Sequence, residues 1–181
     1  MNSGRKGEVI KFLHEAGLIT REKPIIELRE ADLIGANLYG ADLHDVNLSN
    51  ANLSDANLYG ANLQRAELVD ADLSGTNLHG ASLRGANLQD ANLQGANLSG
   101  ANLFSANLFG ANLQGANLQV AILVLTTMIG VNLTNAEMTD AMLEGANLQN
   151  ANLQNAKIIK EQLAITKLLS GATMQDGTIH E

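Results

Sequence analysis

The 181-residue chain has no cysteine and no tryptophan, contains a single proline, and is only 3% aromatic. Without cysteine it can form no disulfide, thiolate metal site or thiol nucleophile. So few aromatic side chains argue against a conventional globular core. No apolar run approaches the roughly 20 residues of a membrane-spanning helix, and the charged N-terminal segment lacks the apolar core of a signal peptide. We therefore expect a cytoplasmic protein with a core of small aliphatic side chains.

Basic residues are also scarce. The chain has 11 lysines and arginines against 19 acids, which gives a net charge of −8. Such a surface repels the phosphate backbone of nucleic acids. Direct nucleic-acid binding is therefore not expected.

What the sequence does contain is a repeat of five residues. Leucine or a close substitute recurs at every fifth position from Leu33 to Ile158, through 26 pentapeptides of the form Ala-Asn-Leu-x-x. On an α-helix these leucines would spiral around the axis, and on a straight strand they would alternate between faces. They all point inward only if the chain bends by about 90° at each pentapeptide, so that about 20 residues close one square coil. We therefore predict an all-β solenoid of about 6–7 coils, with glycines such as Gly35 and Gly60 at the corners because they tolerate positive φ.

Blocks such as Ala86-Asn87-Leu88-Gln89-Asp90 and Ala96-Asn97-Leu98-Ser99-Gly100 carry the repeated motif in full. The run over residues 31–160 resembles the pentapeptide-repeat proteins, whose pattern is A(D/N)LXX. The resemblance implies a right-handed, four-sided parallel β-helix, a family whose biochemical role is usually unknown. The tail from Gly171 to His180 is similar to that of cyanobacterial members, although Gln175 stands where those usually have proline.

We divide the chain into three parts. Residues 1–30 are predicted to form an N-terminal helical cap and an irregular first coil that contains Pro24. Residues 31–158 form the repeat β-helix, and residues 159–181 form a C-terminal helix and tail cap. The caps are expected because an open solenoid end exposes apolar side chains and unpaired strand edges, which invite aggregation.

The two caps are each predicted to contain a helix. Residues 4–17 read as a helix with Val9, Ile10, Leu13 and Ala16 near one face. Residues 160–170 are mostly good helix formers and are followed by Gly171. A continued coil is the alternative there, because Leu163 and Leu168 keep the period of five.

Asparagine before leucine is interpreted as a turn and ladder residue, since side chains 20 positions apart should stack and their amides can hydrogen-bond. An asparagine face that binds carbohydrate or ice is the alternative. Tyr39, Tyr59 and His79 share one outward slot on successive coils. They are interpreted as a stacked surface ladder, with a binding stripe as the alternative.

The most informative deviation from the repeat is a group of apolar residues in outward slots that are otherwise polar. If the register holds, these residues form one patch on two adjacent faces: Phe104, Phe109, Val120, Ile122, Val124, Leu125, Ile129 and Met142. Contiguous exposed apolar surface usually marks a contact. We interpret this apolar patch as a homodimer seam or a protein-docking site. The alternative is a local bulge, or a terminal segment, that hides some of these side chains.

Chemistry for catalysis is absent from the sequence pattern. The four histidines, at positions 14, 44, 79 and 180, have no metal-ligand spacing to one another or to paired acids. A solenoid filled with leucine also leaves no room for a substrate pocket. We therefore expect no enzyme activity, no catalytic residues, no metal site and no cofactor.

Two classes of function remain. The first is a rigid interaction scaffold that contacts a protein through the apolar patch, with a regulatory role in cyanobacterial signalling or cell differentiation as a narrower form. The second is mimicry of DNA, because some proteins of this family bind DNA gyrase. The sequence departs from those relatives, since its repeats run without an inserted loop and no phenylalanine occupies the central slot.

Overall fold

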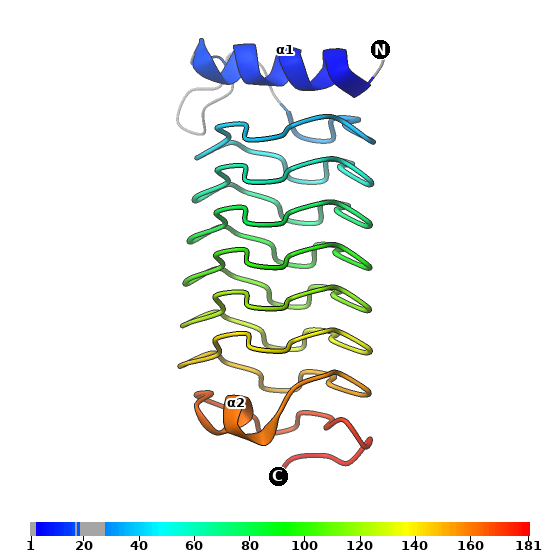
Figure 1. The fold of residues 1–181 in the computed structure, drawn as a ribbon, viewed down its shortest axis with the longest axis vertical. Coiled ribbons are helices and arrows are strands. Elements are labelled where there is room, and N and C mark those ends of the chain that lie inside the picture. The colour runs from blue at the N-terminus through cyan, green and yellow to red at the C-terminus, as the bar shows by residue number, and fades with distance from the viewer. Residues whose placement is uncertain (1–2, 17, 19–27) are drawn as a thin grey trace.

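The computed structural model describes residues 3–16, 18 and 28–181, and it shows the repeats wound into a solenoid of stacked coils (Figure 1). Parallel bridges join residues 20 positions apart, from Asp32 with Asn52 to Glu137 with Lys157. Each turn of 20 residues contributes four such bridges, so each coil has four sides. The predicted parallel solenoid is confirmed.

A tight turn closes every pentapeptide. The amide of Ala36 donates to the carbonyl of Leu33 at 2.9 Å, and the same bond recurs along the solenoid. The residue just before the donor, here Gly35 with φ of 61°, has a positive φ. Glycine, asparagine and aspartate fill this corner most often, because they tolerate the left-handed region best.

The leucine and alanine columns form one continuous core. Every side chain in the central slot from Leu38 to Leu153 is 0% exposed, including Met128 and Met138. Exposure rises only at the two ends, to 4% for Leu33 and 7% for Ile158. The core therefore depends on stacking, because each coil covers its neighbours.

Helix α1 (Ser3–Glu15) lies across the N-terminal end of the solenoid (Figure 1). It meets the coil through Gly7, Ile10 and His14, which are all buried. The predicted face was partly wrong, since Val9 is 43% exposed and Ala16 is exposed. The predicted irregular coil around Pro24 lies outside the described residues.

Side chains of α1 donate to backbone carbonyls of the first fully described coil. Within the stack, the amide of Gly40 donates to the carbonyl of Tyr59 at 2.9 Å. At the N-terminal end of the stack, Lys11 Nζ donates to the carbonyl of Tyr39 at 2.7 Å. His14 Nε2 does the same for the carbonyl of His44 at 3.3 Å.

The C-terminal segment contains a shorter helix than predicted. Helix α2 (Lys160–Ala164) has only five residues, and the chain then returns to the ladder one residue out of phase. Asn147 bridges Leu168, and Asn152 bridges Thr173, each 21 positions away. A coil therefore follows the short helix, but Leu168 is 39% exposed and does not keep the inward period of five on which the continued-coil alternative rested.

Gln162 of α2 supplies a side-chain donor to backbone carbonyls at the C-terminal end of the stack. Its Nε2 donates to the carbonyls of Met138 at 2.8 Å and Ala141 at 2.9 Å. In a regular coil, the carbonyl equivalent to that of Ala141 accepts a backbone amide from the next coil, as Ala121 does from Met142. Buried carbonyls need such a partner, so one glutamine side chain completes the ladder.

Candidate functional site

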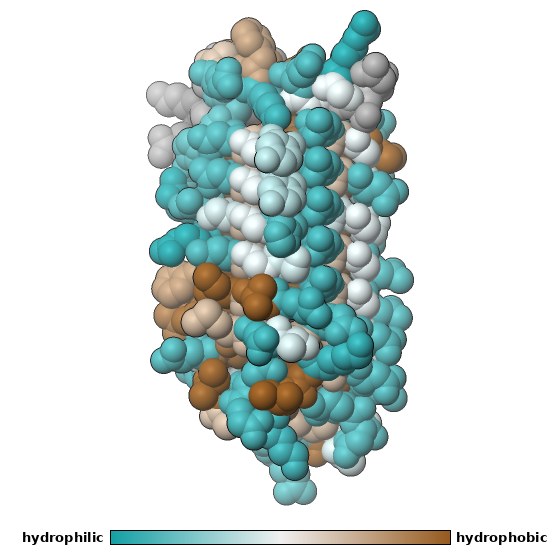
Figure 2. Space-filling model, viewed as in Figure 1, coloured by the Kyte–Doolittle hydropathy of each residue, from teal (hydrophilic) through white to brown (hydrophobic). Residues whose placement is uncertain are grey.

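The apolar patch stays on the surface. Phe109, Val120, Leu125 and Met142 are 45%, 55%, 55% and 52% exposed. The other four members are half-buried: Phe104, Ile122, Val124 and Ile129. In Figure 2 most of the apolar surface on the visible side gathers over the C-terminal half of the solenoid.

The register does not slip where the patch lies. Ile122 bridges Asn102 on one side and Met142 on the other, and Thr127 bridges both Asn107 and Asn147. The bulge that the sequence left open as an alternative is therefore absent from residues 120–130. Strict stacking of residues 20 apart places the eight side chains on two neighbouring faces.

Two patch residues occupy corners that disfavour them. Val120 has φ of 52° and Leu125 has φ of 58°, in the slot that glycine or asparagine usually fills. A β-branched or bulky residue is an outlier in the left-handed region, and such a conformation costs about 1–3 kcal/mol. More than half of each side chain is exposed, so little burial offsets this cost.

The patch also interrupts the asparagine ladder. Elsewhere an asparagine such as Asn92 accepts the amide of Gln94 at 3.3 Å and donates to Asp72 at 3.0 Å. Ile122 and Met142 occupy the same slot of the repeat. Their side chains have no amide group, so they can neither accept nor donate these hydrogen bonds. These bonds agree with the interpretation of asparagine as a turn and ladder residue. The patch lacks them at Ile122 and Met142.

Acidic groups border the patch. A Cβ on Gly110, the residue after Phe109, would lie 2.2 Å from Asp90 Oδ1, so this carboxylate lies over the corner that follows Phe109. Glu144 accepts the amide of Leu125 through its backbone at 2.9 Å and is exposed. The neighbouring base, Arg84, places its guanidinium 4.8 Å from the ring centre of Phe104.

The aromatic ladder is a stack of rings. Tyr39 and Tyr59 lie 5.3 Å apart at 9°, and Tyr59 and His79 lie 5.1 Å apart at 37°. Both faces of the Tyr59 ring are thus occupied by its neighbours. The central ring of the ladder therefore offers only its edges to a ligand.

The acids of the repeats do not form a continuous stripe. The residue stacked 20 positions after an acid is usually an amide, a glycine or a base, as with Arg65 above Asp45 and Lys157 above Glu137. Asp70 and Asp90 are the one pair of acids stacked directly on each other in the repeats. Duplex DNA, in contrast, carries a negative charge at every phosphate.

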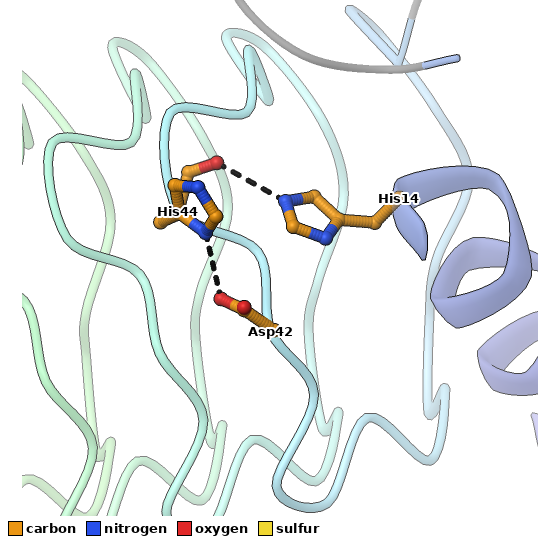
Figure 3. A group of neighbouring side chains, drawn as sticks. All are labelled: His14, Asp42 and His44. Carbon is orange, nitrogen blue, oxygen red and sulfur yellow. Dashed lines mark hydrogen bonds and ion pairs between the residues drawn. The ribbon is translucent and has the colours of Figure 1, made fainter. Parts of the chain in front are cut away.

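The structure brings together three residues that sequence spacing did not connect (Figure 3). One ligand atom each from His14, Asp42 and His44 lies within 4.8 Å of the others. His44 Nδ1 lies 2.9 Å from Asp42 Oδ1, and the two imidazole rings meet edge to face at 4.9 Å. Partial burial raises the pKa of Asp42, but the hydrogen bond from His44 and the nearby imidazole charges outweigh it and hold that pKa below its ordinary value.

These features define the class of the protein as a parallel β-solenoid with four-sided coils. The family profile described as pentapeptide repeats matches it in eight copies, over residues 26–65, 66–104, 81–119, 106–145 and 121–158. The chain belongs to the pentapeptide-repeat family. Members of this family are known as right-handed quadrilateral β-helices and are generally non-catalytic.

Solved structures of cyanobacterial members are similar to the chain. Rfr23 from Cyanothece 51142 is 35% identical over 61% of this chain and 85% of its own, with a TM-score of 0.48. HetL from Nostoc sp. strain PCC 7120, a protein involved in heterocyst differentiation regulation, is 30% identical over 94% of this chain and 98% of its own, with a TM-score of 0.38.

The fluoroquinolone resistance protein QnrB1 is more distant, at 20% identity over 81% of this chain and 74% of its own, with a TM-score of 0.49. No curated protein sequence matches the chain. Within the described residues, neither helix has the length and apolar character needed to cross a bilayer.

Proposed function

We propose that this pentapeptide-repeat protein is a non-catalytic scaffold that docks another protein on its apolar patch. The repeats at 31–158 would form about six and a half right-handed coils, since 26 pentapeptides fill four to a coil. Residues 1–30 and 159–181 act as caps in this proposal. The donors from Lys11, His14 and Gln162 support it, because they bind backbone carbonyls at the two ends of the stack.

The observation that carries the proposal is the conformation of Val120 and Leu125. Each has a positive φ and is 55% exposed. Less than half of each side chain is buried, so burial offsets only part of the cost of the strained backbone. Strain of this kind typically persists at binding sites, and exposed apolar surface typically marks a contact.

The charges around the patch specify the partner. Asp90, Asp140 and Glu144 stand at its edge, while the guanidinium of Arg84 already lies over Phe104. A second copy of the chain would place acids against acids. We therefore propose a different protein, with an apolar centre and a rim of lysine and arginine, because complementary rims favour association.

The experiment compares the wild type with a Val120→Asn/Leu125→Asn double variant. Asparagine suits this corner, as Asn135 with φ of 59° shows, so the double variant should fold. Ile34→Asn is the matched control, because Ile34 is an exposed apolar residue, at 47%, on a distant coil. Proteins captured from an extract of the source organism are identified, purified and titrated against all three forms.

We expect one partner to bind the wild type and the Ile34→Asn control equally, and the double variant at least tenfold more weakly. Its affinity for the wild type should also fall as salt rises, because the rims are charged. Equal binding to all three forms would refute the docking site. A wild type that is dimeric by light scattering, with a monomeric double variant, would refute the choice of a different protein and assign the patch to a second copy.

Two narrower roles rank below this one. DNA mimicry toward gyrase is disfavoured because the acids alternate with amides and bases along each column. A supercoiling assay decides it, and the expected result is no inhibition at micromolar protein. Regulation of cyanobacterial differentiation is compatible with docking, and the identity of the captured partner would test it.

A further inference from the structure

The geometry points to a divalent metal site at His14, Asp42 and His44, with zinc as the expected class of ion. The site would join α1 to the first coil of the solenoid, because His14 comes from the helix and the other two residues come from one face of the coil (Figure 3). It lies on the same face as Phe104 of the apolar patch but three coils away, so it is separate from the patch.

The set of ligand atoms suits zinc. Two imidazoles and one carboxylate bind zinc in many proteins, with water in the fourth position. The two imidazole nitrogens favour zinc and its transition-metal neighbours over magnesium or calcium. Tetrahedral ligands lie about 3.3 Å apart, and the three atoms here lie within 4.8 Å of one another. Small rotations of the exposed Asp42 and half-buried His44 side chains would close this difference.

The tautomer of His14 is set for ligation. Its Nε2 faces the carbonyl oxygen of His44 at 3.3 Å, and a carbonyl oxygen can only accept, so Nε2 carries the proton. The other ring nitrogen, Nδ1, then keeps its lone pair available for an ion. A metal-bound histidine typically donates its second nitrogen to a carbonyl in this way.

The Asp42 carboxylate is also oriented by a hydrogen bond from the next coil. Asn62 Nδ2 donates to Asp42 Oδ1 at 2.9 Å, which orients the carboxylate as second-layer partners of metal ligands do. His44 Nδ1 shares a proton with the same oxygen at 2.9 Å. Metal binding through Nδ1 would replace that proton with the ion and release it to solvent.

The alternative is that the three residues form only a hydrogen-bonded contact that docks α1. The two readings differ in one respect. A hydrogen-bonded contact is indifferent to zinc, whereas a metal site gains affinity and local order when zinc is added.

The test is calorimetric titration of the untagged full chain with zinc. We expect one site in the wild type, and at least tenfold weaker binding in Asp42→Asn, which keeps an oxygen for the bond from His44. His79→Gln is the matched control, because His79 is a surface histidine whose Nδ1 lies 2.6 Å from Ser99 Oγ on another face. The control should bind zinc as the wild type does, and magnesium should give no binding in any form.

Hydrogen exchange over residues 3–16 gives a second readout. Zinc should slow exchange of α1 several-fold in the wild type and in His79→Gln, but not in Asp42→Asn. Equal zinc affinity in Asp42→Asn and wild type would overturn the site, as would exchange of α1 that zinc leaves unchanged. The Val120→Asn/Leu125→Asn variant should bind zinc normally, which keeps this result independent of the docking proposal.

Discussion

A Cβ atom on Gly7 would lie 1.8 Å from the backbone carbonyl oxygen of Asn37. The obstacle is backbone rather than a flexible side chain, so it cannot move aside without shifting the first coil. Helix α1 therefore packs as closely on the solenoid as the chain allows. Gly7, Ile10 and His14, at spacings of three and four, form the line of contact.

The Gly7→Ala substitution should separate α1 from the first coil. An added methyl group in this contact should cost about 1–3 kcal/mol, as overpacking usually does. Hydrogen exchange of residues 3–16 should become several-fold faster, while exchange in the central coils should stay unchanged.

Gly4→Ala is the control for helix propensity. Gly4 is exposed in the same helix, and alanine there should stabilise the helix by up to about 1 kcal/mol. If Gly7→Ala slowed exchange as Gly4→Ala should, the close contact between α1 and Asn37 would be refuted.

Acid should weaken the same helix through Asp32. Lys6 Nζ lies 3.0 Å from Asp32 Oδ1, and this bond, with a second from the amide of Ile34, holds the pKa of Asp32 below 3.8. A lowered carboxyl pKa means that the bond stabilises the folded state above pH 3.8 and is lost as pH falls through the folded pKa. An NMR titration of the carboxyl carbon should place the midpoint below 3.8, and Lys6→Gln should move it back upward. An unmoved midpoint in Lys6→Gln would mean that the ion pair does not form in solution.

Gln162→Glu should destabilise the C-terminal end. The introduced carboxylate would face the carbonyls of Met138 and Ala141 and could donate to neither. The carbonyl of Met138 keeps the amide of Ala141 as a donor at 3.1 Å, but the carbonyl of Ala141 loses its donor. Leaving one buried acceptor without a donor costs about 1–3 kcal/mol, so urea denaturation should show a loss of about 2 kcal/mol. Gln154→Glu is the matched control, because Gln154 is exposed, and it should change stability by less than about 0.5 kcal/mol.

The loss in Gln162→Glu should also shrink as pH falls. Burial raises the pKa of a carboxyl group, and the protonated form can donate again. A penalty that does not depend on pH would point to packing rather than to the missing donor.

The period of five predicts the solenoid because it constrains the whole chain at once. Leu73 and Leu93 point inward in the structure, and the step of 20 residues between stacked positions holds throughout the repeats. This rule is also what places Ile122 beside Met142 without any structural information. A strict repeat therefore allows the position of each surface residue on the solenoid to be assigned from the sequence.

The ends could not be predicted in the same way. The sequence pattern selected Val9 and Ala16 for the buried face of α1 because they are apolar. The structure instead buries Gly7, which permits close approach, and His14, which donates to a carbonyl. A pattern of apolar residues detects neither close approach nor hydrogen bonding. The sequence therefore did not predict the cluster of His14 with Asp42 and His44 either.

The last prediction concerns the stability of the fold when Val120 and Leu125 are replaced. Replacing both by asparagine should raise the free energy of unfolding by about 1 kcal/mol per site, because the strained corner conformation is relieved. Urea denaturation measures this gain, with Ser105→Asn as the control, since Ser105 has φ of 54° at the same kind of corner and has no β-branch to relieve. The control should gain less than either patch site. If the double variant were instead less stable than the wild type, the two side chains would contribute to folding, and their position would no longer argue for a partner. A more stable solenoid that has lost its partner would show that the patch is retained for binding, at the expense of the fold.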